Sequence, residues 1–165
     1  PFVQLITKAK PCELTEHGIL FDNMSTFDKN AVYPCGKRIP AEHYRACSID
    51  DSYASPAVSL CTDVNGILQI DGLALKQWMD YKINILSGVK DFQIRYTATR
   101  DSEITIYRVD ENGNETALQT IALPSTASKT AWTTLTESFT PEAGEQVLRL
   151  KCTKGLPRIN WFKLK

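Results

Sequence analysis

The sequence lacks long apolar runs, a surplus of charge of either sign and any segment built like a membrane anchor. No apolar run approaches the ~18 residues of a membrane span, and residues 1–10 lack the uninterrupted apolar core of a signal peptide. Lys and Arg number 19, and so do Asp and Glu, so no net field draws the chain to nucleic acid or to an anionic membrane. The sequence therefore predicts no nucleic-acid partner and no membrane insertion.

Histidine is scarce, and the common catalytic motifs are missing. His17 and His43 are the only histidines, and the chain contains no G-x-S-x-G, no H-E-x-x-H and no phosphate-binding loop. We therefore expect that the chain is not itself an enzyme. A carboxylate pair for glycoside hydrolysis is the alternative that motifs leave open, because acid and nucleophile can come from distant strands.

The five cysteines form no C-x-x-C pair and have no histidine at zinc spacing, which argues against a structural zinc site. Because their number is odd, they cannot all pair within one chain. Cys152 is the best candidate for a free thiol, since it ends an alternating strand and packs there as a small hydrophobe. Either the others pair as Cys12 with Cys35 and Cys47 with Cys61, or all five are reduced; sequence does not fix which.

Alternating apolar residues dominate the chain from Trp78 onward. The segments 92–98 and 104–107 both have the period of two that half-buried strands show. Asn112-Gly113 supplies the positive φ angles of a tight hairpin turn, which leads into a strand at 116–123. Further strands are expected at 132–139, 147–152 and 159–164. Short strands with a turn signal roughly every ten residues predict an all-β fold, an antiparallel β-sandwich of the jelly-roll type.

The first 38 residues have a weaker pattern. Strands are expected at 1–6 and 18–21, followed by a polar loop, and the residues P-C-G-K-R at 34–38 are typical of a linker. We therefore expect residues 1–38 to be an N-terminal extension or the end of a preceding domain. Residues 39–165 are expected to form the sandwich.

Several short motifs in the sandwich carry a family resemblance. They are I-P-A-E-H-Y at 39–44, W-M-D-Y-K-I-N at 78–84, L-P-S-T at 123–126, W-T-T at 132–134 and R-I-N-W-F at 158–162. In this order and spacing they resemble the family 6 carbohydrate-binding modules, noncatalytic β-sandwiches attached to polysaccharide-degrading enzymes. Related galactose-binding-like sandwiches are the alternative.

The resemblance implies a sugar site in the loops at one end of the sandwich. In that family two aromatic rings clasp the sugar and an asparagine of the last loop hydrogen-bonds its hydroxyls, because a sugar has an apolar face and a polar rim. Here Lys129 stands where a loop tryptophan is expected and Arg158 where the asparagine is expected. Tyr53 is then the aromatic side chain left for a ligand. The rings expected in the core are Trp78, Tyr81, Trp132 and Trp161.

Cations thus replace rings at the expected site. Lys129, Lys154 and Arg158 are all expected near this end, and ammonium and guanidinium groups suit carboxylate or sulfate. The predicted ligand-binding residues are therefore Lys129, Arg158, Tyr53 and Lys154, and the predicted ligand is an acidic or sulfated glycan. The alternative is a scattered basic face that contacts only water.

Glu42 resembles one of the family's calcium-binding glutamates, and oxygen ligands suit a hard cation. Its usual partner two residues earlier is Pro40 here, which has no ligating side chain. Asp50, Asp51 and Asp63 are the other acidic residues that the sequence offers for calcium.

The expected function is noncatalytic binding of a polysaccharide or oligosaccharide by an accessory domain of a glycan-degrading enzyme. A catalytic domain of the same polypeptide is then the expected partner, and the expected location is extracellular or periplasmic, where the polymer is met. The alternative is a structural or protein-docking sandwich that braces a catalytic neighbour without binding sugar. Missing stacking residues are what this alternative predicts.

Overall fold

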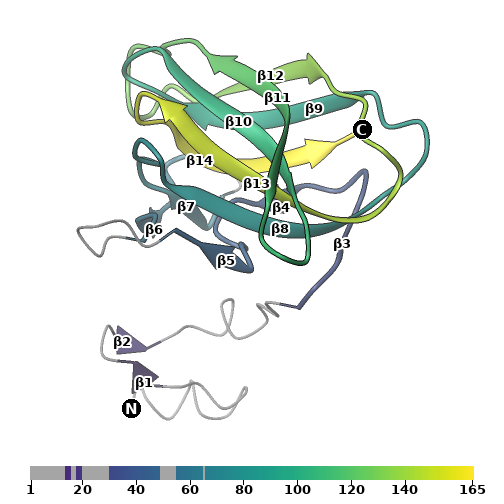
Figure 1. Ribbon diagram of the computed structural model, residues 1–165. Coiled ribbons are helices and arrows are strands. Elements are labelled where there is room, and N and C mark those ends of the chain that lie inside the picture. Colours follow the sequence, from purple (N-terminus) through teal and green to yellow (C-terminus); the bar gives the residue numbers. More distant parts are fainter. Residues whose placement is uncertain (1–13, 16–17, 20–29, 49–54, 65) are drawn as a thin grey trace. The chain divides into compact units, whose positions relative to one another are not determined.

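The structure, a computed structural model, describes residues 14–15, 18–19, 30–48, 55–64 and 66–165 (Figure 1). The chain divides into two compact units, Pro1–Ala31 and Val32–Lys165. In the first unit β1 (Leu14–Thr15) pairs antiparallel with β2 (Gly18–Ile19), which falls within the strand predicted at 18–21. The strand predicted at 1–6 lies outside the described residues.

Two sheets make up the second unit. The first contains β3 (Tyr33–Pro34), β5 (Ala46–Cys47), β8 (Trp78–Ile85), β10 (Ser102–Val109), β11 (Glu115–Leu123) and β13 (Gly144–Lys154). The second contains β4 (Ile39–Pro40), β6 (Val58–Leu60), β7 (Leu68–Ile70), β9 (Asp91–Thr97), β12 (Thr133–Ser138) and β14 (Arg158–Leu164). Their orders are β11-β10-β13-β8-β3, with β5 also on β8, and β12-β9-β14-β7-β6, with β4 also on β14.

The pairing in both sheets is antiparallel except where β3 runs parallel to β8. The described residues include no helix, and hence none that could cross a membrane. The predicted all-β sandwich is therefore confirmed, because the period of two along β8 to β14 gives each strand one apolar face.

The core lies between the two sheets and follows from that alternation. Met79, Tyr81 and Ile83 of β8 point inward and are fully buried. The edge of the Tyr81 ring packs on Phe162 of β14, with the ring centroids 4.7 Å apart. Burial raises the pKa of Tyr81 well above its usual value, and its hydroxyl donates a hydrogen bond to the Ala41 carbonyl at 2.5 Å. The two sheets are thus joined through the residues predicted for the inner faces.

The prediction that three tryptophans belong to the core is wrong. Trp78, Trp132 and Trp161 are all only half-buried, whereas Tyr81 is in the core as predicted. Side chains of a strand alternate between its faces, so Trp78 and Tyr81, three residues apart, point to opposite sides. Trp161 likewise points away from the face that its neighbour Phe162 occupies. Trp78 and Trp161 therefore lie on the outer faces of the sheets.

The predicted hairpin is present between β10 and β11. Gly113 has a φ of 83°, and the Asp110 carboxylate accepts hydrogen bonds from the backbone N–H groups of Asn112 and Asn114 at 2.9 and 2.8 Å. The predicted boundary at residue 38 differs from the compact unit, which starts at Val32. Tyr33–Pro34 pairs with β8, and the Gly36 N–H donates to the Leu164 carbonyl, so the expected linker at 34–38 is part of the second unit.

The cysteines of the described residues are unpaired. Cys35, Cys47 and Cys61 are free, so of the two alternatives the one with disulfides Cys12–Cys35 and Cys47–Cys61 is not found. Cys12 lies outside the described residues. Cys152 is free and buried, as expected, and burial raises the pKa of its thiol to about 11.

Candidate functional site

The loop end is the edge of the sandwich where β13 ends and β14 begins, at the left of Figure 1. Two contacts fix its loops to the second sheet. The Thr97 hydroxyl donates a hydrogen bond to the Ser128 carbonyl at 2.5 Å, and the Thr126 N–H donates to the Ala98 carbonyl at 2.7 Å. We define the loop end as residues 71–76, 98–101, 124–131 and 154–158.

The structure brings three of the predicted site residues to this end. Arg158 lies opposite Thr97 in the β14–β9 ladder, Lys129 follows the Ser128 carbonyl that Thr97 contacts, and Lys154 ends β13. Both lysines are exposed, and among the described residues no carboxylate forms an ion pair with either ammonium group. They are therefore accessible cations, as the sequence predicts.

Arg158 differs from the two lysines. Its side chain is only 13% exposed, and its Nε donates to Oδ1 of Asp71 in an ion pair. Most of its charge is thus balanced within the protein. Tyr53, the predicted stacking residue, lies outside the described residues.

The loop end has no aromatic side chain in the segments that define it. Tyr96 lies beneath these loops but is buried, and its hydroxyl donates to the Pro124 carbonyl at 3.0 Å. Burial is the main cause that raises the pKa of Tyr96 above its usual value. The described segments of the loop end therefore present hydroxyl and charged groups rather than an aromatic ring.

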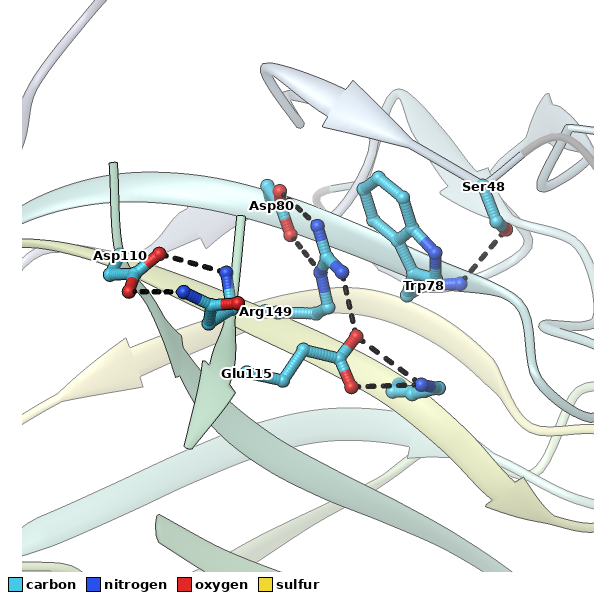
Figure 2. Close-up of polar contacts among 8 residues, drawn as sticks. Ser48, Trp78, Asp80, Asp110, Glu115 and Arg149 are labelled. Carbon is cyan, nitrogen blue, oxygen red and sulfur yellow. Dashed lines mark hydrogen bonds and ion pairs between the residues drawn. The ribbon is translucent and has the colours of Figure 1, made fainter. Parts of the chain in front are cut away.

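The outer face of the first sheet holds a charged cluster that sequence reasoning missed. Figure 2 shows the Arg149 guanidinium between two carboxylates, those of Asp80 and Glu115. Arg149 donates to both oxygens of Asp80, at 2.7 and 2.8 Å, and its Cζ lies 3.5 Å from the centroid of the Trp78 ring. Lys151 also pairs with Glu115 and lies over the Tyr107 ring at 5.4 Å. Both rings on this face are thus covered by cations.

A groove of about 640 Å³ adjoins this cluster and runs along β8, β10 and β13. Its charged residues are largely paired with one another or with neighbours, as in the ion pairs Lys82–Glu145, at 2.5 Å, and Arg108–Glu142, at 2.7 Å. Its lining residues include no aromatic side chain. The cluster spans four strands, so no short motif reveals it; the signal in the sequence was only that Asp80 and Arg149 occupy outward positions.

Glu42 does not lie in a calcium cage built from the described residues. Its Oε2 is buried without a hydrogen-bond partner, and burial raises its pKa to about 7. No group of three or more His, Cys, Asp or Glu side chains that could hold a metal occurs in the described part of the chain. Asp63 is bound to Arg95 instead, which with other hydrogen bonds lowers its pKa, and Asp50 and Asp51 lie outside the described residues. Among the described residues, Glu42 and Asp63 therefore do not form a metal site with other acidic side chains.

Two β-sheets packed around one apolar core define a β-sandwich. The model of the family "Carbohydrate binding module (family 6)" matches residues 41–165. The chain therefore belongs to this family, and residues 41–165 form a sugar-binding module. No curated protein matches the chain.

Solved structures agree with the sandwich fold. A β-1,3-glucan-binding family 6 module from Bacillus halodurans has a TM-score of 0.68 and 20% identity, covering 82% of this chain and 99% of that one. A module from the Cellvibrio mixtus lichenase 5A, in complex with cellotriose, has a TM-score of 0.67 and 23% identity, covering 78% and 95%. An arabinoxylan arabinofuranohydrolase of glycoside hydrolase family 43 from Bacillus subtilis, in complex with cellotetraose, has a TM-score of 0.67 and 13% identity. There the match covers 94% of this chain and 33% of that one.

Proposed function

We propose that this module is noncatalytic and binds an acidic or sulfated polysaccharide at its loop end, with Lys129 and Lys154 as the anion contacts. The observation that carries the proposal is that both ammonium groups are exposed and lack an ion-pair partner among the described residues. A lysine offers a neutral sugar no stacking face, whereas a hydrogen bond to a charged group contributes about 1.5–3 kcal/mol. The chemistry of the loop end therefore favours a ligand with carboxylate or sulfate groups.

Arg158 acts in this proposal as part of the scaffold. Its ion pair with Asp71 joins the start of β14 to the segment that follows β7. An anion that bound Arg158 would have to compete with the Asp71 carboxylate for the guanidinium. Lys129 and Lys154 have no such competitor among the described residues and are therefore the cations that this proposal assigns to the anion; Lys76 and Arg100, which are also exposed and unpaired at this end, add to the positive charge there.

The proposal also implies that this module is linked to a catalytic domain. A binding module of this family recruits a catalytic domain to a polymer, and in the Bacillus subtilis arabinofuranohydrolase the matched part is about a third of a longer chain. We infer that this module likewise works beside a glycan-degrading catalytic domain, outside the cell where such polymers occur. Solved relatives that bind cellotriose or β-1,3-glucan support sugar as the ligand, while Lys129 and Lys154 favour an anionic one.

Isothermal titration of the full chain tests the proposal with polygalacturonate, a sulfated galactan and a neutral β-glucan. We expect binding to the two anionic polymers that weakens as salt is added, because exposed charges are screened. The double variant Lys129→Gln/Lys154→Gln should bind at least about ten-fold more weakly, since two exposed charge contacts of about 0.7 kcal/mol each add to about 1.4 kcal/mol. Lys90→Gln, at the opposite end beside the start of β9, is the matched control and should bind like the wild type.

Two results would overturn the proposal. Equal affinity for neutral and anionic polymers, unchanged in the double variant, would show that the two lysines are solvated surface residues that do not contact the ligand. No binding to any of the three polymers would favour the domain that braces a catalytic neighbour.

A further inference from the structure

A short strap crosses the outer face of the second sheet. We use this name for residues 62–64, which lie between β6 and β7. Its anchor is Asp63, whose carboxylate is only 5% exposed and accepts hydrogen bonds from Nε and Nη2 of Arg95 at 2.7 and 2.8 Å. Asn160 Nδ2 and the Val64 N–H donate to the same carboxylate, each at 2.9 Å. The strap is therefore fixed to both β9 and β14.

The other end of the strap is fixed as well. Thr62 accepts a hydrogen bond from Nε1 of Trp132 at 3.0 Å, and its N–H donates to the Gln69 side chain at 3.2 Å. Trp132 precedes β12, so the strap spans the sheet from β7 to its β12 edge. A surface built from such a strap is rigid enough to present a shaped hollow.

A hollow of about 240 Å³ lies beside the strap. Drug-sized ligands occupy pockets of about 300–1,000 Å³, so this hollow is suited to one small group or a single ring. The Arg38 guanidinium lies over the Trp161 ring, with Cζ 4.4 Å from the ring centroid, and so covers a face that a sugar would otherwise stack on. The residues that line the hollow are Arg38, Asp63, Val64, Arg95, Thr134 and Trp161.

The charges around the hollow leave one cation unbalanced. Two guanidinium groups, those of Arg38 and Arg95, face a single carboxylate, and Asp63 already accepts four hydrogen bonds. Among the described residues no carboxylate forms an ion pair with Arg38. Arg95 Nη1 lies 3.5 Å from the Thr134 hydroxyl oxygen. This contact is long for a hydrogen bond, so Nη1 is able to donate to a ligand in the hollow. The hollow therefore offers N–H and O–H donors and one net positive charge.

We propose that this hollow is a second ligand site of the module and binds one oxyanion, a carboxylate or a sulfate ester carried on a sugar ring. Guanidinium forks match the geometry of both groups, and the Asp63–Arg95 pair holds one fork in place before the ligand arrives. The proposal rests on the proposed function only in naming a sugar as the carrier of the anion. The site itself is separate from Lys129 and Lys154.

NMR titration of the full ¹⁵N-labelled chain tests the proposal with glucuronate and glucose 6-sulfate, and with glucose as the neutral probe. We expect both anions, but not glucose, to shift the Trp161 indole N–H and the Arg95 Nε–H signals in a saturable manner. Arg38→Gln should weaken this binding at least ten-fold. Lys37→Gln removes the same charge from the adjacent exposed residue and should change the affinity less than two-fold.

The failure of this proposal and the failure of the proposed function give different results. Shifts confined to the loop end, or equal losses in Arg38→Gln and Lys37→Gln, would overturn the second site and leave the proposed function standing. Saturable binding of glucuronate that depends on Arg38, with no polymer affinity that depends on Lys129 and Lys154, would support the hollow and overturn the loop-end proposal alone. Lys129→Gln/Lys154→Gln should leave the shifts at Trp161 unchanged.

Discussion

Replacing Arg149 by methionine isolates a buried carboxylate and should be strongly destabilising. The side chains of Arg149 and Asp80 are only 11% and 8% exposed, and the two form a bidentate ion pair (Figure 2). Removing one partner of a buried pair costs about 3–5 kcal/mol, because the other charge stays buried without compensation. Methionine is long and flexible enough to keep the contact with the Trp78 ring, so the loss measures charge rather than packing.

Urea unfolding at neutral pH gives the free energy of unfolding for each variant. We expect Arg149→Met to lose about 3–5 kcal/mol and the double variant Asp80→Asn/Arg149→Met to regain most of it. Arg108→Met is the matched control: its ion pair with Glu142 is exposed, and we expect a loss of no more than about 1 kcal/mol. Similar small losses for both single variants would refute the reasoning.

Two further predictions concern stability. Burial raises the pKa of Glu42 from 4.5 to about 7. The folded state therefore loses stability as the pH rises from 4.5 to 7, because the carboxylate must ionise while buried. The expected loss is about 1–2 kcal/mol once the partial exposure of Glu42 is taken into account. Glu42→Gln should remove this slope in unfolding curves between pH 4.5 and 8, and parallel slopes for the two proteins would contradict it. Gly155 and Gly113 have φ of 81° and 83°, but a Cβ on Gly155 would lie 2.2 Å from the Ser102 hydroxyl, whereas nothing lies within 4 Å at Gly113. Gly155→Ala should therefore lower the free energy of unfolding in urea by about 1–3 kcal/mol more than Gly113→Ala does. Equal losses would show that the loop at Gly155 moves to accommodate the added methyl group.

Local patterns predicted the strands well, because alternation and turn chemistry act within a few residues. The hairpin at Asn112-Gly113 and the strands from β8 to β14 are examples. The family resemblance similarly predicted that Lys129 and Arg158 lie at one end of the sandwich. What a side chain contacts across the sheet was not predictable in the same way.

Some contacts could not be predicted because the partners come from distant segments of the chain. The Arg158 guanidinium is paired with Asp71, 87 residues earlier, and Trp132 donates to Thr62, 70 residues earlier. The prediction for Trp78 failed for a simpler reason. Strand alternation places it on the face opposite Tyr81, whereas the family resemblance implied a position in the core.

The covered rings explain why charge rather than stacking is expected to govern recognition by this module. A cation over an aromatic face contributes about 0.5–2 kcal/mol, and a sugar that stacked there would have to displace it. Arg149 covers Trp78, Lys151 lies over Tyr107 and Arg38 covers Trp161. Arg149 and Lys151 are held by carboxylates in ion pairs, whereas Arg38 has no such partner among the described residues and is exposed. An anionic ligand can therefore form an ion pair with Arg38, which a neutral sugar ring cannot do. On the outer face of the first sheet, by contrast, carboxylates of the protein already pair with the cations that cover the rings.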